Sequence, residues 1–237
     1  MRFEPPLQEA QLVRRYKRFL ADVERLPGYG RLTVHCPNTG SMLGCAGPGM
    51  RIWLSRAANP ARKYAWTWEL VEASPGVRVG IHTGRSNGLV REALETSLID
   101  ELRGYPGLQG EVRVQPGFRV DFLLSGHRRK PDCYLEVKNV TAAVDGGIAL
   151  FPDAVSERAS RHLRELMARV RQGQRAMLCF CVQREDVREV RPADTIDPEY
   201  GKTLRKALKA GVEVCAYGAR VSPTEVVLCR RLSVILP

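Results

Sequence analysis

Two short apolar runs joined by a turn-forming segment constrain this chain more than any other feature. Residues 120–124 and 134–140 have the composition of β-strands, and the polar segment 125–132 between them contains Gly126 and Pro131. These turn formers favour an antiparallel pairing of the two runs as a hairpin. We expect the rest of the second half of the chain to be organised around this hairpin.

Three charged residues interrupt the two runs: Asp121 in the first, and Glu136 and Lys138 in the second. Alternate side chains of a strand share a face, so Glu136 and Lys138 point the same way while Val137 points into the core. A suitable hairpin register adds Asp121 to this group. Two converging carboxylates repel each other unless a cation lies between them.

Carboxylates in this arrangement suit Mg²⁺ or Mn²⁺, because hard divalent ions are bound through one or two carboxylates together with water and substrate phosphate. Lys138 would orient or deprotonate an attacking water and stabilise negative charge on a phosphate. We therefore take Asp121 and Glu136 as candidate metal ligands. Together with Lys138, they are also the candidate catalytic residues of a phosphodiesterase. The competing interpretation is an ordinary exposed Glu-x-Lys pair on a strand.

These residues resemble the core motif of the PD-(D/E)xK nuclease superfamily, although Val120 stands where the motif has proline. A longer set of segments resembles the family of sugar fermentation stimulation protein A (SfsA): PPL at 5–7, RYKRFLADV at 15–23, HCPNTG at 35–40, EVKNVT at 136–141 and FPDAV at 151–155. Because these segments are spread over roughly the first two thirds of the chain, they are more specific than the three-residue motif alone.

The resemblance implies an OB-fold barrel followed by a nuclease-like α/β domain. Nuclease folds of this kind often carry an additional acid on the helix before the central hairpin, and Glu92 is the candidate in that place. A solvated surface glutamate is an equally simple interpretation of Glu92.

The first part of the chain consists of short apolar runs separated by turn formers, at 12–23, 31–36, 51–55, 64–71 and 77–82. Five such strands predict a small barrel, for which an OB-fold is the natural candidate. Past Thr83 the pattern alternates between helices and strands, which predicts an α/β sheet covered on both sides. We expect an OB-like barrel over residues 1–83 and a PD-(D/E)xK nuclease-like domain over residues 84–237.

Two helices are predicted on either side of the hairpin. The first is capped by Ser86 or Asn87 and ended by Gly104, with an apolar stripe formed by Val90, Leu94, Leu98 and Leu102. The second helix runs to about Arg171. Its inward face is formed by Val155, Ala159, Leu163, Leu166, Met167 and Val170. We assign His162 to the surface or to packing. Residues 176–182 predict a buried strand.

The net charge of +11 and a pI near 9.6 favour a polyanionic partner. Bases alternate with aromatic residues in two barrel segments, and arginines recur on the second helix. The candidate nucleic-acid-binding residues are Arg14, Arg15, Lys17, Arg18, Arg62, Lys63, Arg158 and Arg161. The competing interpretations are a solvated basic surface and aromatic side chains that fill the barrel. The polar loop 35–41 either presents amides and hydroxyls to a phosphate or forms an ordinary turn.

The sequence has seven cysteines, which is an odd number, and most of them lie in apolar runs. Both facts favour a protein of the reducing cytoplasm over a disulfide framework or a zinc site. No apolar run is long enough to span a membrane, and no secretory signal begins the sequence. A homo-oligomer is compatible with the sequence, which carries no signal for one.

Three functions remain open at this point. The first is a metal-dependent nuclease that acts on DNA, with RNA as the other substrate class. The second is a DNA-binding protein without turnover that regulates sugar-utilisation genes, as the family's name implies. The third is an RNA processing or repair factor. Because the sequence has no helix-turn-helix or zinc-finger signature, binding through phosphates independently of base sequence is favoured.

Overall fold

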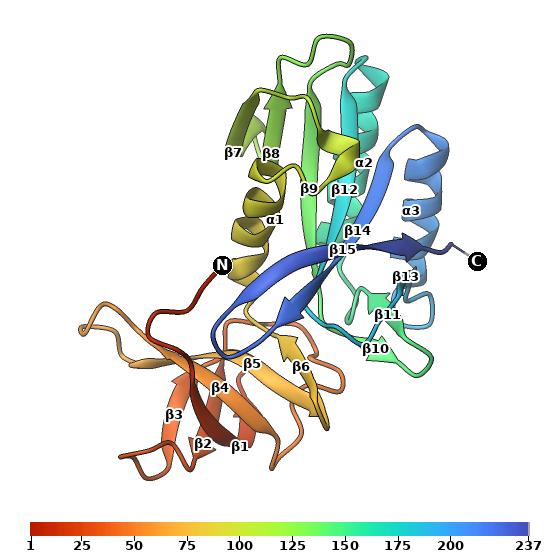
Figure 1. Ribbon diagram of the computed structural model, residues 1–237. Coiled ribbons are helices and arrows are strands. Elements are labelled where there is room, and N and C mark those ends of the chain that lie inside the picture. The colour runs from red at the N-terminus through yellow and green to blue at the C-terminus, as the bar shows by residue number, and fades with distance from the viewer. Residues whose placement is uncertain (237) are drawn as a thin grey trace.

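The computed structural model describes residues 1–236, which form two β-sheets (Figure 1). The first sheet has the order β3-β2-β1-β4-β5-β6. Its strands are β1 (Gln8–Tyr16), β2 (Leu20–Glu24), β3 (Leu32–His35), β4 (Arg51–Arg56), β5 (Trp66–Ser74) and β6 (Val77–Gly80). A parallel pairing of β3 with β5 at His35 and Thr67 closes five of these strands into a barrel, which confirms the predicted OB-like fold.

The predicted strand 12–23 is wrong in one respect, because it is a hairpin rather than a single strand. β1 and β2 are antiparallel, with Tyr16 opposite Leu20. Lys17 and Arg18 form the turn with φ of 50° and 63°. Lysine and arginine rarely adopt a positive φ, so the amino-acid composition of residues 12–23 did not predict a turn at this point.

Tryptophan side chains fill the barrel, as one of the two interpretations of its aromatic residues expected. Trp66 and Trp68 are buried, and the Trp68 indole N–H donates to the Leu70 carbonyl over 2.8 Å. Phe19, by contrast, lies exposed at the β1–β2 turn. The first six residues of β5 are all buried, and the exposed aromatic residue Phe19 lies in a turn.

The second sheet has nine strands in the order β10-β11-β13-β15-β14-β12-β9-β8-β7. They are β7 (Gly107–Gln115), β8 (Phe118–Ser125), β9 (Cys133–Val140), β10 (Ala143–Val144), β11 (Ile148–Phe151), β12 (Arg175–Val182), β13 (Glu189–Pro192), β14 (Glu213–Val221) and β15 (Val226–Val234). Strands β9, β12 and β14 run parallel, and the predicted hairpin is β8 and β9.

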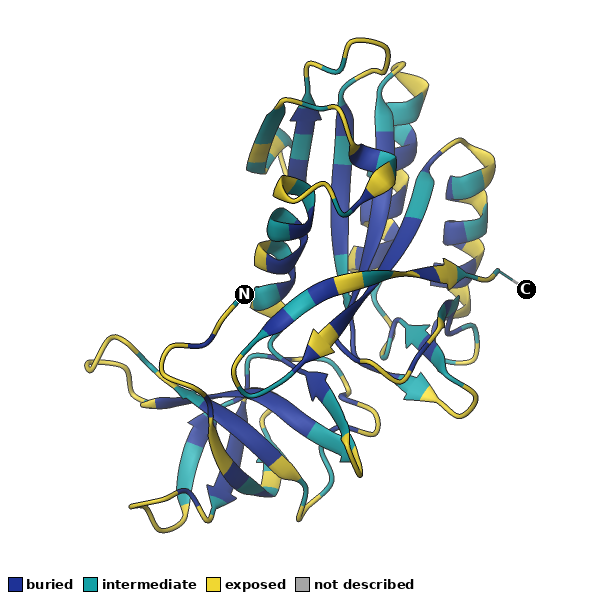
Figure 2. Ribbon diagram, viewed as in Figure 1, coloured by how far each residue is buried: buried dark blue, intermediate teal, exposed yellow. Residues whose placement is uncertain are grey.

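Helices cover both faces of this sheet, and its central strands are buried along most of their length (Figure 2). Helix α1 (Ser86–Glu95) packs on the face to which β12 contributes Met177 and Cys179. Helices α2 (Glu157–Arg171) and α3 (Pro198–Lys209) pack on the face to which β12 contributes Leu178 and Phe180. The mixed sheet with helices agrees with the predicted α/β fold, and the buried strand expected at 176–182 is confirmed.

Both predicted helices are shorter than expected. Helix α1 ends at Glu95, because Ser97 takes a positive φ of 56°, so Leu98 and Leu102 lie beyond it. Ser86 is its first residue rather than a cap. Helix α2 begins only after Ser156, whose hydroxyl accepts from the Ala159 N–H, and Val155 is 72% exposed instead of facing inward.

The barrel and the mixed sheet are joined by hydrogen bonds as well as by the chain. The Asp153 carboxylate accepts from the Ser41 hydroxyl and the Met42 N–H over 3.2 and 3.0 Å. The Gly80 N–H donates to the Gln183 carbonyl over 2.8 Å. Within residues 1–236, no helix is both long and apolar enough to cross a bilayer.

Candidate active site and nucleic-acid interface

Asp121 lies where strands β8 and β9 separate. Their ladder pairs Phe122 with Leu135, so Asp121 and Glu136 are the next positions along the two strands. The Asp121 Oδ2 atom accepts from the Val137 N–H over 2.7 Å, and its Oδ1 atom accepts from the Asn87 amide over 2.9 Å. The carboxylate is thus held in place by a β9 amide and by the start of helix α1.

Glu136 is almost completely enclosed, with 3% of its surface exposed. Its Oε1 atom accepts from Lys138 Nζ over 2.7 Å and from His162 Nδ1. Its Oε2 atom is buried and has no hydrogen-bond partner among residues 1–236. One oxygen is therefore positioned by the protein, and the other is left free to bind a ligand.

His162 is the site residue that the sequence analysis missed. It projects from α2, is buried, and also lies 3.4 Å from Lys138 Nζ through Nδ1, while its Nε2 atom accepts from Arg158 over 3.4 Å. The sequence did contain a signal, because His162 follows Ala159 by three positions and therefore falls on the inward face of the helix. Helical spacing predicts that His162 faces inward, but it does not predict that the side chain contacts the buried Glu136 of β9.

Opposing effects act on the two carboxyl groups. Burial raises the pKa of Asp121, and the nearby charge of Glu136 raises it further, against the hydrogen bonds from Val137 and Asn87. Burial also raises the pKa of Glu136, but the hydrogen bond from His162 and the charge of Lys138 outweigh burial and bring this pKa below its usual value. The charge of Glu136 thus disfavours ionisation of Asp121.

A divalent ion fits this donor set. The Oε2 atom of Glu136 has no hydrogen-bond partner among residues 1–236, and the Glu136 charge raises the pKa of the half-buried Asp121 carboxyl. Residues 1–236 contain no group of three or more His, Cys, Asp or Glu side chains placed to hold a metal. An ion at this position would therefore depend on the two carboxylates, with water and substrate oxygens completing its coordination, as Mg²⁺ commonly does.

Glu92 lies on the helix before the central hairpin, as the resemblance implies, but it pairs with the N-terminus. Its carboxylate is 2.6 Å from the Met1 amino group. Among the contacts of residues 1–236, none joins Glu92 to Asp121, Glu136 or Lys138. From α1 it is Asn87, one turn earlier, that reaches Asp121. A catalytic role for Glu92 stays a prediction without geometric support.

A basic groove adjoins the carboxylate cluster. It has a volume of about 360 Å³ and is lined by Arg113, Gly117, Phe118, Arg119, Arg158, Arg161 and His162. Two of these arginines, on α2, were expected from the sequence, and the other two come from the β7–β8 hairpin. The groove brings guanidinium groups next to the histidine that contacts Glu136.

The basic residues of the barrel have different surroundings. Arg14 forms an ion pair of 2.8 Å with Asp22 and lies over the Tyr16 ring. Arg15 donates to the carbonyls of Asn38, Gly40 and Arg18 over 2.8 to 2.9 Å. Arg15 therefore supports a loop, and its donors are directed inward.

The remaining predicted bases of the barrel lie in two turns. Lys17 and Arg18 are exposed at the β1–β2 turn, and Arg62 and Lys63 are exposed in the β4–β5 loop. Lys63 lies over the Tyr64 ring at 5.6 Å. The structure thus separates the eight predicted bases into several places instead of one continuous surface.

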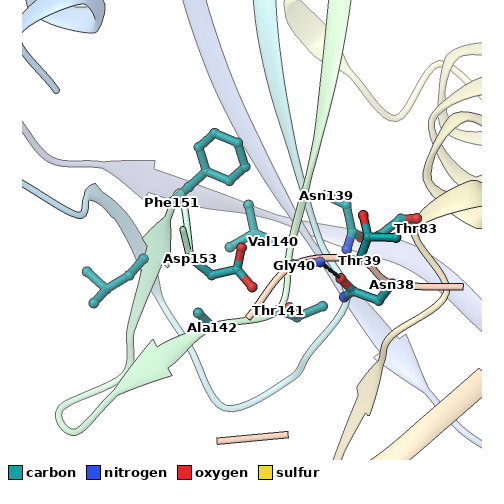
Figure 3. Close-up of a pocket in the computed structure, with 11 residues that line it drawn as sticks. Asn38, Thr39, Gly40, Thr83, Asn139, Val140, Thr141, Ala142, Phe151 and Asp153 are labelled. Atoms are coloured by element: carbon teal, nitrogen blue, oxygen red, sulfur yellow. Dashed lines mark hydrogen bonds between the residues drawn. The ribbon is translucent and has the colours of Figure 1, made fainter. Parts of the chain in front are cut away.

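The loop that Arg15 supports closes a small pocket between the two sheets (Figure 3). Three of the segments singled out in the sequence meet there: residues 38–40, 139–141 and 151–153. The pocket has a volume of about 150 Å³. Figure 3 shows the Asp153 carboxylate directed at Gly40, where a Cβ atom would lie only 2.7 Å from it. A larger residue at position 40 would displace the Asp153 carboxylate from its hydrogen bonds with Ser41 and Met42.

Comparisons with known proteins agree with this geometry. The family model described as "Sugar fermentation stimulation protein RE domain" matches residues 84–225, and "SfsA N-terminal OB domain" matches residues 13–81. The sugar fermentation stimulation protein homolog of Thioalkalivibrio sulfidiphilus is 61% identical over 237 residues, covering 100% of this chain and 98% of that protein. The homolog of Alkalilimnicola ehrlichii is 58% identical over 239 residues and covers 100% of both.

The chain belongs to the SfsA family. A solved structure of Pyrococcus furiosus SfsA in complex with Ca²⁺ matches it with a TM-score of 0.86 and 28% sequence identity, covering 99% of this chain and 98% of the other. The family resemblance drawn from the sequence segments is thus confirmed.

Proposed function

We propose that this SfsA family member binds nucleic acid, chiefly DNA, independently of base sequence, and hydrolyses phosphodiester bonds at a divalent-metal site. The observation that carries the proposal is the contact of Glu136 with both Lys138 and His162, beside Asp121 and the arginine groove. A buried carboxylate with a free oxygen next to a basic groove favours substrate phosphate and a cation together.

Asp121 and Glu136 are the residues that would hold the ion, Mg²⁺ or Mn²⁺. The Ca²⁺ in the related SfsA structure supports a divalent cation of this class. A bound ion would supply positive charge at the scissile phosphate and favour deprotonation of a water. Asn87 and the Val137 N–H orient Asp121, so that its position does not depend on the substrate.

Lys138 is suited to orient the attacking water and to stabilise developing charge on the phosphate. Its Nζ atom is held by Glu136 and lies beside His162, which limits the positions available to a flexible side chain. Arg158 and Arg161 would bind phosphates on either side of the reacting bond, and the barrel's exposed turns would bind them further away. Residues 1–83 thus contribute to binding, and residues 84–237 contribute both the phosphate contacts of Arg158 and Arg161 and the chemistry. A reducing cytoplasm matches the seven free cysteines.

Labelled single- and double-stranded DNA and RNA, incubated with the purified protein in Mg²⁺, Mn²⁺ or chelator, test the proposal. We expect cleavage of DNA that requires Mg²⁺ or Mn²⁺ and is abolished by Asp121→Asn. Binding without cleavage in every metal would contradict the nuclease proposal and favour the second candidate below. Cleavage restricted to RNA would instead support a role in RNA processing.

The second candidate is a DNA-binding protein without turnover, which regulates sugar-utilisation genes. It is favoured by the modest donor set, since residues 1–236 contain no group of three or more His, Cys, Asp or Glu side chains placed to hold an ion. A nuclease-like fold is compatible with a protein that only binds. Asp121→Asn would then leave every measurable property of DNA binding unchanged.

A further inference from the structure

A second polar cavity lies away from the carboxylate cluster, against the outside of the barrel. It has a volume of about 330 Å³ and is bounded by residues 2–5, the end of β4, the start of β5 and the segment before α1. The N-terminal residues cover it because Phe3 is buried in the core shared with α1. The N-terminus, the β4–β5 hairpin and the segment before α1 thus meet at this cavity.

Guanidinium groups surround this cavity in excess of the acids that face it. Arg85 is neutralised by Glu69, which it contacts over 2.7 Å. Arg56 and Arg62 also line the cavity, and neither has an ion-pair partner among the described residues. In the N-terminal segment Arg2 and Glu4 both line the cavity and their charges offset each other, so the excess comes from Arg56 and Arg62. The balance of charge favours an anion.

Buried polar atoms without partners provide an independent observation. Thr67 lines the cavity with only 4% of its surface exposed, and its hydroxyl has no hydrogen-bond partner within residues 1–236. His82 also lines the cavity, and its buried Nδ1 atom has no partner there either. Such groups are rare in folded proteins, because each loses its hydration without a replacement, and a ligand or water in the cavity would supply the missing partner.

The donors and the volume together specify the ligand. A phosphate group accepts hydrogen bonds on three oxygens and pairs with guanidinium groups in bidentate fashion. The cavity is larger than a free phosphate needs, and Phe3, Pro5 and Ala57 give it an apolar wall. We propose that this cavity binds a phosphate monoester through Arg56, Arg62 and Thr67. The monoester is either a free nucleotide-sized molecule or the terminal phosphate of a nucleic-acid strand.

Calorimetric titration of the full chain, in chelator and in buffer free of phosphate, tests this site without any cleavage. The probes are inorganic phosphate, a nucleoside 5′-monophosphate, and one oligonucleotide with and without a 5′-phosphate. We expect saturable binding of the monophosphate, or tighter binding of the phosphorylated oligonucleotide. The first result identifies a free molecule as the source and the second identifies a strand end.

Three variants decide whether Thr67 and the arginines are responsible. Thr67→Val keeps the side-chain volume and removes only the unpartnered hydroxyl, so it should fold with unchanged or higher Tm yet bind the monoester at least about 10-fold more weakly. Arg62→Gln should weaken it similarly. Lys202→Gln, which removes the same charge from the exposed face of α3, should not. Equal affinity in wild type and Thr67→Val, or no saturable binding of any probe to the wild type, overturns the proposal.

Discussion

Two aspartates, the buried Asp22 in the barrel and the half-buried Asp121 in the mixed sheet, have opposite electrostatic surroundings. Asp22 in β2 accepts from Arg14, Thr33 and Tyr16 over 2.8 to 3.1 Å. Burial raises its pKa, but these three partners outweigh burial and bring the pKa below its usual value. Asp121 in β8 has two neutral donors and a second carboxylate nearby, and its pKa is raised. A satisfied acid indicates structure, and a destabilised acid beside a second one indicates a site.

The same contrast applies to the arginines. Arg15 in the barrel donates to three main-chain carbonyls and so holds a loop, whereas Arg161 on α2 lines an open groove. Both belong to basic stretches that look alike in sequence. Their hydrogen-bond partners distinguish them, and the experiments below measure that distinction.

The largest effect is expected at Glu136. Glu136→Gln keeps the shape but removes the charge that would hold a cation, so metal-dependent cleavage should fall at least about 1,000-fold while metal-free DNA binding is retained. Single-turnover cleavage and binding titrations measure the two quantities. The matched control is Glu157→Gln, which removes an exposed carboxylate from α2, the helix that carries His162. Loss of binding along with cleavage would mean that Glu136 is a structural acid like Asp22.

Lys138 should affect rate more than binding. We expect Lys138→Ala to slow single-turnover cleavage by about 100-fold and to change DNA affinity by much less, because its proposed contact strengthens in the transition state. Parallel measurements of rate and Kd test this. Equal losses in both would make Lys138 a simple phosphate contact.

The arginines of α2 should affect binding alone. The double variant Arg158→Gln/Arg161→Gln should weaken binding of two unrelated DNA sequences equally, and lower the slope of log K against log salt by about 0.7 to 0.9 per lost contact. Fluorescence titrations at several salt concentrations provide the slopes. An unchanged slope, or a strong preference for one DNA sequence, would contradict phosphate binding in the groove.

In the barrel, Asp22→Asn should reduce stability by about 1–3 kcal/mol at neutral pH, since charged hydrogen bonds to a buried group are lost. The folded pKa of Asp22 lies below 3.8, so its contribution is present above that value and disappears as pH falls through the folded pKa. Denaturant unfolding of both proteins from neutral to acidic pH measures the difference. A difference that does not shrink in acid would contradict the electrostatic account.

The smallest effect, of opposite sign, is expected for the stability of Asp121→Asn. Because the folded pKa of Asp121 is raised, its charge costs stability above that pKa, and the cost vanishes below 3.8. In chelator at neutral pH the variant should match or exceed wild type by up to about 1 kcal/mol. Thermal unfolding in chelator across this pH range tests the sign. Destabilisation as large as that of Asp22→Asn would remove the contrast between the two acids.

The sequence by itself determined the local elements, because their periodicity and turn formers act over a few residues. The alternation in 120–124 and 134–140 predicted strands β8 and β9, and it placed Glu136 and Lys138 on one face. The apolar run 176–182 similarly predicted a buried strand. Helical spacing in α2 also predicted that Arg158 and Arg161 lie on the face of the helix opposite its apolar residues.

Only the tertiary structure decided which of these residues meet. His162 is one inward position among several until α2 packs over β9 and places it against Glu136. Asn87 reaches Asp121, and Arg15 turns inward to the carbonyls of 38–40, through contacts that no sequence spacing encodes. Periodicity specifies a face of an element, but the identity of the partner on that face depends on how distant elements pack, and that is decided by the whole core.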